Sequence, residues 1–101
     1  MDKDKLKGYI NICRKAGYLI IGGEKLTDYN KKLFLVLYDK NAMKNTTKVV
    51  NKIKEKNIQT IECEDLEEIV SIKSCKIIGI KNKNLSDVIL NLFNDKGVNI
   101  G

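Results

Sequence analysis

The chain has 101 residues, of which 43% are hydrophobic and 32% are charged, with a formal net charge of +6 at pH 7. This length suits one domain with a modest core, and the hydrophobic content excludes wholesale disorder. No apolar run approaches the roughly 20 residues of a membrane span, and the charged N-terminal residues lack a signal-peptide core. We therefore expect a single cytoplasmic domain over residues 1–101, with a frayed tail at 95–101.

The first half of the chain predicts a helix, a strand, a second helix and a second strand. The apolar face of the first helix has helical spacing and consists of Leu6, Tyr9, Ile10, Cys13 and Ala16. Gly17 follows as the expected C-terminal cap. Residues 18–21 are an apolar run too short for a helix, whereas residues 24–30 predict a short helix. The continuous apolar run at 33–38 is typical of a strand that is covered on both faces.

The second half continues the alternation. It predicts a helix over 42–56, a strand over 58–63, a short helix through about residue 71, a strand over 76–80 and a helix over 85–92. Asn84 is the expected N-cap of the last helix, with Asp87 three residues on. The carboxylates between Glu62 and Glu68 suit the start of a helix better than a metal or acid–base site. We expect a three-layer α/β/α sandwich around a four-stranded, mostly parallel sheet.

The residue types that catalysis and metal binding require are sparse. Histidine is absent, and Cys13, Cys63 and Cys75 form no Cys-x-x-Cys pair, so they do not match a structural zinc site. Each cysteine falls at an apolar position of its segment, which predicts three buried thiols and no disulfide. No serine or cysteine has a nucleophile-elbow setting. We therefore expect neither an enzyme nor a bound metal or cofactor.

The positive net charge favours an anionic partner. Arg14 is the single arginine among 19 basic residues, although nucleic-acid interfaces usually use arginine for its bidentate fork. Gly22 and Gly23 form a two-glycine turn before the second predicted helix, where bare N–H groups can bind phosphate or carbonyl oxygens. The same turn is also explained by a strand-to-helix connection that needs a positive φ. Both interpretations stay open at this point.

Three segments carry a family pattern. The first is Leu6 to Gly23, an apolar helix followed by Arg-Lys-Ala-Gly and then by Gly-Gly-Glu-Lys. The second is the run 35–37 followed by Asn41 to Lys48, with Asn-Ala-Met-Lys-Asn-Thr-Thr-Lys, and the third is Ile58 to Glu68. In these segments, and in the order of its elements, the chain resembles the ribosomal protein L-seven-Ae/L-thirty-e superfamily. The resemblance is greatest to the small bacterial YlxQ-type branch. It implies RNA binding, with kink-turns as the characteristic ligand of the superfamily.

The resemblance also implies which residues contact RNA. The superfamily's Gly-x-Asn-Glu-x-x-Lys pattern faces the RNA from the start of the second helix, and here Gly23, Lys25, Leu26 and Tyr29 occupy its four named positions. The loop before the last strand completes the site. The expected RNA-binding residues are Arg14, Gly22, Gly23, Glu24, Lys25, Tyr29, Lys31, Lys32, Ile72 and Lys73.

Other surfaces offer weaker candidates. Lysines at 44, 48, 52 and 56 repeat every four residues on one predicted helix; we expect them to face solvent, with a phosphate-tracking stripe as the alternative. Tyr9 and Tyr38 lie on predicted core faces, whereas Tyr18 and Tyr29 remain candidates for stacking on bases.

The sequence therefore predicts a monomeric accessory factor of the translation apparatus that binds structured RNA, such as ribosomal RNA. Ribosomal, transcription or translation proteins are further candidate partners, and no membrane is expected. A second hypothesis is a diverged scaffold of the same fold that binds protein. It depends on Leu26 and Tyr29, which place apolar side chains where the superfamily has polar ones.

Overall fold

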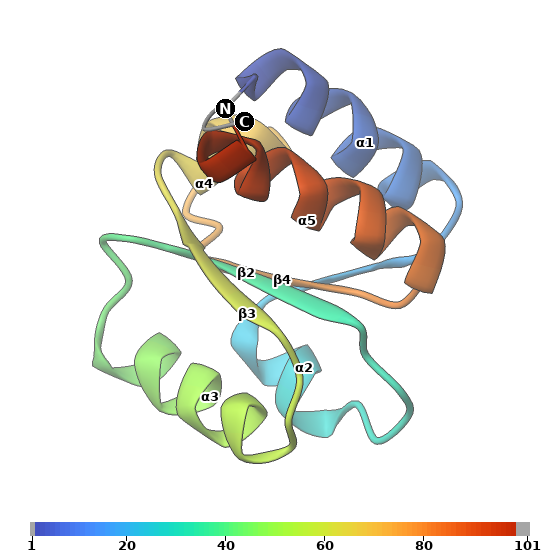
Figure 1. Ribbon diagram of the computed structural model, residues 1–101. Coiled ribbons are helices and arrows are strands. Elements are labelled where there is room, and N and C mark those ends of the chain that lie inside the picture. Colours follow the sequence, from blue (N-terminus) through green and yellow to red (C-terminus); the bar gives the residue numbers. More distant parts are fainter. Residues whose placement is uncertain (1, 99–101) are drawn as a thin grey trace.

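Five helices and four strands alternate along the chain in the computed structural model, which describes residues 2–98 (Figure 1). The elements are α1 (Lys3–Lys15), β1 (Leu19–Ile21), α2 (Gly23–Asp28), β2 (Leu35–Asp39), α3 (Lys44–Glu55), β3 (Thr60–Cys63), α4 (Leu66–Val70), β4 (Ile77–Ile80) and α5 (Lys83–Val98). None of the described helices is long and apolar enough to cross a membrane.

The strands form one mixed sheet in the order β1-β4-β2-β3. β4 pairs antiparallel with both β1 and β2, while β2 pairs parallel with β3. At one end of the sheet, Leu19 and Leu35 both lie opposite Ile80, and we call this the Ile80 end. At the other end, which we call the Ile77 end, β4 begins, β2 finishes at Asp39 and β3 finishes at Cys63.

The expectation of a mostly parallel sheet is wrong for β4, and the loop before it shows why. After α4 the chain folds back on that helix: the N–H of Ile72 donates to the carbonyl of Glu67 at 3.2 Å, and the N–H of Ser74 donates to the Glu67 carboxylate. The chain therefore starts β4 at the Ile77 end, where β3 finished, and β4 runs opposite to β1 and β2. Its four residues are all buried, as befits a strand between two others.

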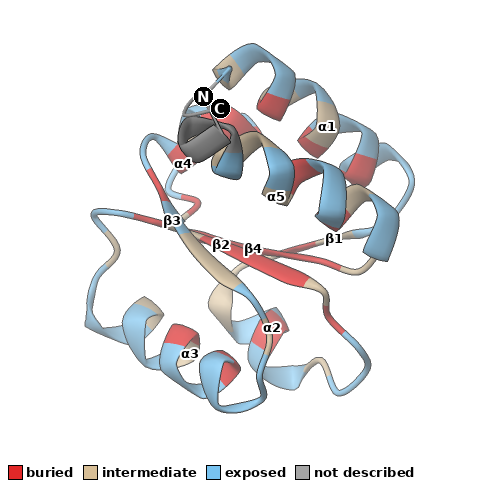
Figure 2. Cartoon of the chain, in the orientation of Figure 1, coloured by how far each residue is buried: buried red, intermediate tan, exposed pale blue. Residues whose placement is uncertain are grey.

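The helices cover both faces of the sheet and create two core clusters (Figures 1 and 2). On one face lie α1, α4 and α5, whose buried residues include Leu6, Leu66 and Ile89. On the other face lie α2 and α3, which bury Leu26 and Ile53 against the sheet. The arrangement has the three layers that the alternating pattern predicts.

Several local predictions are confirmed. Gly17 has φ +78° after α1, as a C-terminal cap requires. The structure adds an N-cap that was not predicted, since Asp2 accepts from the N–H groups of Asp4 and Lys5. All three cysteines are buried with free thiols. Tyr9 and Tyr38 pack against the two core clusters.

The predicted limits of the last helix are wrong at both ends. Asn82, rather than Asn84, acts as the cap, because its Oδ1 accepts from the N–H of Leu85 at 2.9 Å. The helix then continues to Val98, beyond the predicted residue 92. The expected fraying at 95–101 stays a prediction, and residues 99–101 lie outside the described part of the chain.

Candidate functional site

The two-glycine turn joins β1 to α2 in a tightly held conformation. Gly22 has φ +98°, which favours glycine, and its N–H donates to the carbonyl of Ile77 at 3.1 Å. Gly23 packs against α3, since a Cβ there would lie 3.3 Å from Val49 Cγ2. Gly22 offers no side-chain cap, and the N–H groups of Gly23, Glu24 and Lys25 have no partner among the described residues.

The side chains of α2 divide between solvent and core. Glu24 and Lys25 are exposed, while Leu26 is only 2% exposed and packs beside Gly79 of the central strand. Leu26 therefore contributes no apolar surface, which removes half of the basis for the protein-binding hypothesis. Tyr29 is half-buried against the second core cluster.

The loop between α4 and β4 reaches the same end of the sheet as the glycine turn. The hydrogen bond from Gly22 to Ile77 links the end of the loop to the start of α2. Ile72 packs against the first core cluster, and Lys73 is exposed. Arg14 lies elsewhere, at the end of α1, where its guanidinium donates to the carbonyl of Val70 at 3.3 Å.

Carboxylates gather at this Ile77 end. Asp39 is buried and accepts from the N–H groups of Asn41 and Leu66. A hollow beside it is lined by Asp39, Asn41, Asp65, Glu67, Glu68 and Lys76. The N–H of Ser74 and the ammonium of Lys76 lower the pKa of Glu67, and Lys3 followed by Lys7 lowers that of Glu68. The surroundings of the glycine turn therefore have mixed charge.

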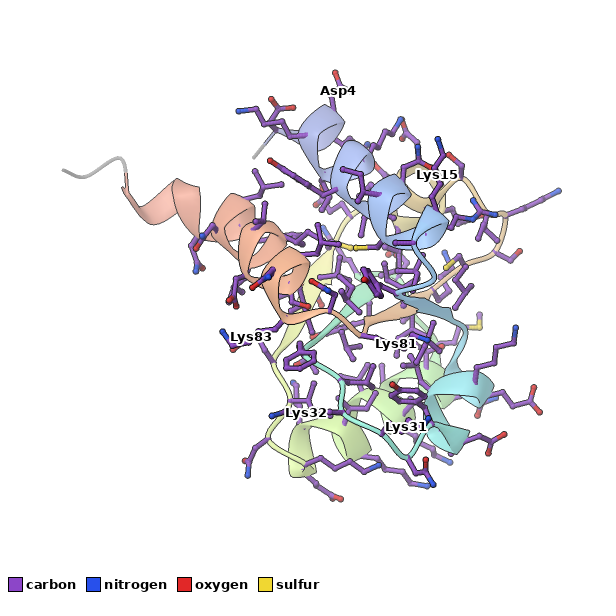
Figure 3. The ribbon with its side chains drawn as sticks, turned by 90° about the vertical axis from the view of Figure 1, so that its right-hand side faces the viewer. Asp4, Lys15, Lys31, Lys32, Lys81 and Lys83 are labelled. Atoms are coloured by element: carbon purple, nitrogen blue, oxygen red, sulfur yellow. The ribbon has the colours of Figure 1, made fainter. Side chains whose placement is uncertain are left out.

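The opposite, Ile80 end of the sheet carries a cluster of lysines. Figure 3 shows these residues on one side of the molecule, and we call them the lysine face: Lys15, Lys31, Lys32, Lys81 and Lys83. They come from the end of α1, the connection between α2 and β2, and the chain from Lys81, just after β4, to Lys83, the first residue of α5. Among the described residues, only Lys83 of this group forms an ion pair, with Asp87 at 3.1 Å.

Aromatic rings are interleaved with these lysines. The ammonium of Lys81 lies 5.8 Å from the ring centroid of Tyr29, and that of Lys32 lies 5.4 Å from the ring centroid of Phe34. Both distances fall within the range of a cation–π contact. Tyr18 is 37% exposed, and its carbonyl accepts from the N–H of Lys81 at 2.8 Å. Charge and aromatic surface thus meet at one end of the sheet.

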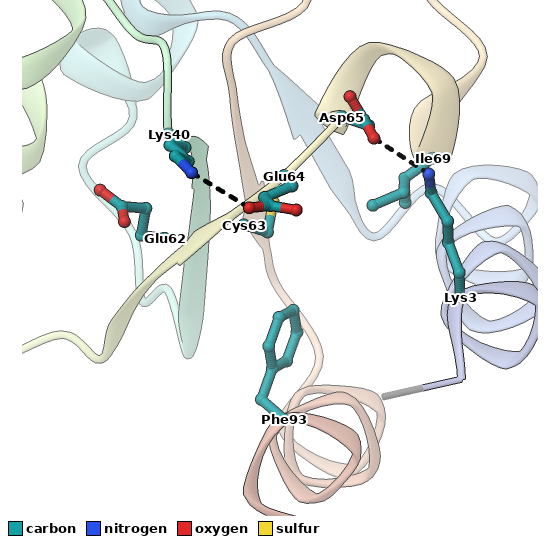
Figure 4. A pocket seen from close by; sticks show the side chains of 8 residues that line it. All are labelled: Lys3, Lys40, Glu62, Cys63, Glu64, Asp65, Ile69 and Phe93. Carbon is teal, nitrogen blue, oxygen red and sulfur yellow. Dashed lines mark hydrogen bonds and ion pairs between the residues drawn. The ribbon is translucent and has the colours of Figure 1, made fainter. Parts of the chain in front are cut away.

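A separate hollow lies between β3, α4 and the N-terminal part of α1 (Figure 4). Its charged side chains are largely paired: Lys40 with Glu64 at 3.1 Å, and Lys3 with Asp65 at 3.2 Å. Burial, followed by the charge of Asp39, raises the pKa of the Cys63 thiol to about 12. Such a thiol remains protonated at neutral pH and cannot act as a nucleophile.

The structure therefore divides the predicted RNA-binding residues among three places. Gly22, Gly23, Glu24, Lys25, Ile72 and Lys73 belong to the Ile77 end, Tyr29, Lys31 and Lys32 to the Ile80 end, and Arg14 to the α1–α4 contact. Sequence reasoning missed Lys81, Lys83 and Phe34. In the sequence these residues are marked only by their positions near the ends of predicted strands. Such a position does not show which distant segments of the chain lie next to them in the fold.

Comparisons with known proteins establish the fold but no family. No family model matches the chain, and no curated protein matches it. Among solved structures, a protein with unknown function from Bacillus halodurans superposes with a TM-score of 0.79 at 19% sequence identity. The match covers 89% of this chain and 97% of that one.

Proposed function

We propose that this protein is a non-enzymatic, RNA-binding accessory factor of the translation apparatus, acting as a monomer in the cytoplasm. The observation that carries the proposal is the lysine face, where cations from three separate segments lie on one side of the molecule, with Lys15 apart from the others. Four of the five have no anionic partner among the described residues. Phosphates would supply the missing counter-charges, and releasing their condensed counterions would drive binding.

The position of these lysines is not explained by helix stability. Lys15 lies in the last turn of α1, where a cation favours the helix dipole. Lys31, Lys32 and Lys81 lie outside the helices, and Lys83 is the first residue of α5, where the dipole disfavours a cation. Lys83 also pairs with Asp87 one turn along α5, which favours the helix. A contribution to ligand binding therefore accounts better than a contribution to helix stability for Lys31, Lys32 and Lys81.

The decisive experiment compares two triple variants with the same change in net charge. Lys31→Gln/Lys32→Gln/Lys81→Gln alters the lysine face, and Lys48→Gln/Lys52→Gln/Lys56→Gln alters the exposed stripe along α3. We expect the first variant to weaken binding of a fluorescent RNA stem-loop about tenfold or more, because three phosphate contacts are lost. Equal weakening in both variants would reduce the interaction to non-specific attraction by net charge.

Kink-turn recognition is the narrower part of the proposal, and it belongs to the start of α2. There the N–H groups of Gly23, Glu24 and Lys25 are unpaired within the described residues and lie beside the loop before β4. Gel shifts on a standard kink-turn and its disrupted mutant, with wild type and Lys25→Glu, test it. Selective binding that Lys25→Glu abolishes supports recognition here, and loss of selectivity in wild type contradicts it.

The competing scaffold function predicts a different result in cells. Affinity purification with and without nuclease treatment separates the two: protein partners that persist after nuclease treatment, with no co-purifying RNA, favour the scaffold. Tyr29 is its remaining structural support, because Leu26 is buried.

A further inference from the structure

Aromatic side chains lie beside the lysines of the lysine face. The end of β4 connects them: Lys81 donates its N–H to the carbonyl of Tyr18 at 2.8 Å, and Phe34 donates its N–H to the carbonyl of Ile80 at 3.0 Å. Tyr18 and Phe34 therefore flank the end of β4 on its two sides, and Tyr29 lies beneath the ammonium of Lys81. Three rings accompany the five lysines on this side of the molecule: Tyr18 from the connection between α1 and β1, and Tyr29 and Phe34 from the connection between α2 and β2.

We propose that the lysine face binds a single-stranded segment of RNA and that Tyr18, Tyr29 and Phe34 are the platforms on which its unpaired bases stack. This inference rests on the proposed function and names the part of the RNA that the surface takes. Basic surfaces with interleaved aromatic side chains suit single strands, because every unpaired base offers a π-face whereas paired bases are enclosed in the duplex.

Two of the rings already hold a cation that a base could replace. Lys81 lies over Tyr29 and Lys32 over Phe34, each at a distance at which the ring attracts an ammonium. When a base stacks on the ring, the displaced ammonium can turn to the adjacent phosphate on its flexible stem. The ring then contacts the base of a nucleotide, and the displaced ammonium contacts its phosphate. In the free protein, the cation–π contact holds each lysine near the position from which it would bind that phosphate.

The first test asks whether the protein prefers single-stranded RNA to duplex RNA. We compare wild-type affinity for a single-stranded RNA of about 12 nucleotides, a blunt duplex of the same sequence and an abasic strand of the same length. Charge alone favours the duplex, whose phosphates are denser. We expect the single strand to bind about tenfold more tightly than the duplex, and the abasic strand to lose this advantage. Equal or weaker binding of the single strand overturns the inference.

Variants of the rings give the second test. Tyr18→Leu/Tyr29→Leu removes two platforms and is expected to weaken single-strand binding about tenfold while leaving duplex binding unchanged. The matched Tyr18→Phe/Tyr29→Phe variant keeps both rings and should bind as wild type does. Full affinity in the leucine variant, with an unchanged far-ultraviolet circular dichroism spectrum, contradicts stacking.

The two proposals fail in distinguishable ways. If the lysine-face triple variant weakens binding of both single strand and duplex but wild type prefers neither, stacking is wrong and RNA binding stands. If wild type binds none of the RNAs, both proposals are wrong.

Discussion

At the scale of single residues, Gly79 shows how closely α2 approaches the sheet. A Cβ at this position would lie 2.5 Å from Leu26 Cδ2 and 3.2 Å from Leu33 Cδ2, and both leucines are buried. Gly79→Ala should therefore lower the free energy of unfolding by about 1–3 kcal/mol through overpacking. Urea unfolding followed by circular dichroism measures the change.

Gly8 is the matched control for that substitution. It lies exposed within α1, and a Cβ there would meet nothing within 4 Å. Gly8→Ala should raise the free energy of unfolding by about 0.5–1 kcal/mol, because alanine loses less backbone entropy in a helix. The same substitution thus has opposite signs at the two sites; a stable Gly79→Ala variant would mean that Leu26 can move aside.

The thiols provide a second prediction about single residues. Burial is the main reason that the pKa of Cys63 rises to about 12, and burial also raises the pKa of Cys13 and Cys75. An unfolded thiol has a pKa of about 8.5. At pH 8, Ellman's reagent should therefore label the native protein slowly and label all three thiols at once in urea. Rapid labelling of one native thiol would indicate that its segment opens readily.

The energies at the aromatic rings favour the exchange proposed for the lysine face. A cation–π contact at an exposed site contributes about 0.5–1 kcal/mol. Stacking of a base on an aromatic side chain contributes about 1–3 kcal/mol. The free energy lost when Lys81 leaves Tyr29, or Lys32 leaves Phe34, is therefore smaller than the free energy gained when a base stacks on the ring. The released ammonium remains free to bind phosphate.

At the scale of elements, α4 is held by carboxylates that depend on pH. Glu68 pairs with Lys3 and Lys7, while Glu67 accepts from the N–H of Ser74 and pairs with Lys76. These contacts lower the pKa of both carboxyls from an ordinary value of 4.5. Their stabilisation is present above that value and is lost as the pH falls through the lowered, folded-state pKa.

Low pH should therefore reduce the stability of the folded protein, in part because the contacts of the α4 carboxylates are lost. We expect the urea midpoint to fall between about pH 5 and pH 3, and to fall less in Glu67→Gln/Glu68→Gln, which lacks the titrating groups. Glu24→Gln/Glu62→Gln is the matched control, since neither residue forms an ion pair among the described residues. An acid response identical in both double variants would exclude this role for α4.

The elements also show which features could be predicted from the sequence. The helical spacing of Leu6, Ile10 and Cys13 and the apolar run before Asp39 identified α1 and β2, because these patterns are local. The direction of β4 could not be predicted in this way, because it depends on how the loop after α4 folds back on Glu67. The lysine face escaped prediction for a related reason: the strand order brings Lys15, Lys32 and Lys81 to one side of the molecule.

At the scale of the whole molecule, three helices share one direction. α2 and α3 begin at the Ile77 end and run towards the Ile80 end, and α1 runs the same way, from Lys3 beside Asp65 to the residues that precede β1. Helix N-termini attract acidic side chains and C-termini attract basic ones. The carboxylates of α4 and the cations that end α1 and α3 follow this rule, whereas Lys44 and Lys83 begin α3 and α5 against it.

The salt dependence of binding measures how many cations of the lysine face reach phosphate. Each phosphate neutralised on a single strand contributes about −0.7 to the slope of log K against log salt. Four lysines of the lysine face form no ion pair with the described residues, and they predict a slope of about −3. Lys31→Gln/Lys32→Gln/Lys81→Gln should reduce its magnitude to about 1, because Lys15 alone of the four remains. The α3 variant Lys48→Gln/Lys52→Gln/Lys56→Gln should keep the wild-type slope although its net charge changes equally. A flat response in wild type would mean that phosphate is not the ligand of this surface; a shallow slope in both variants would instead assign binding to the total charge of the molecule.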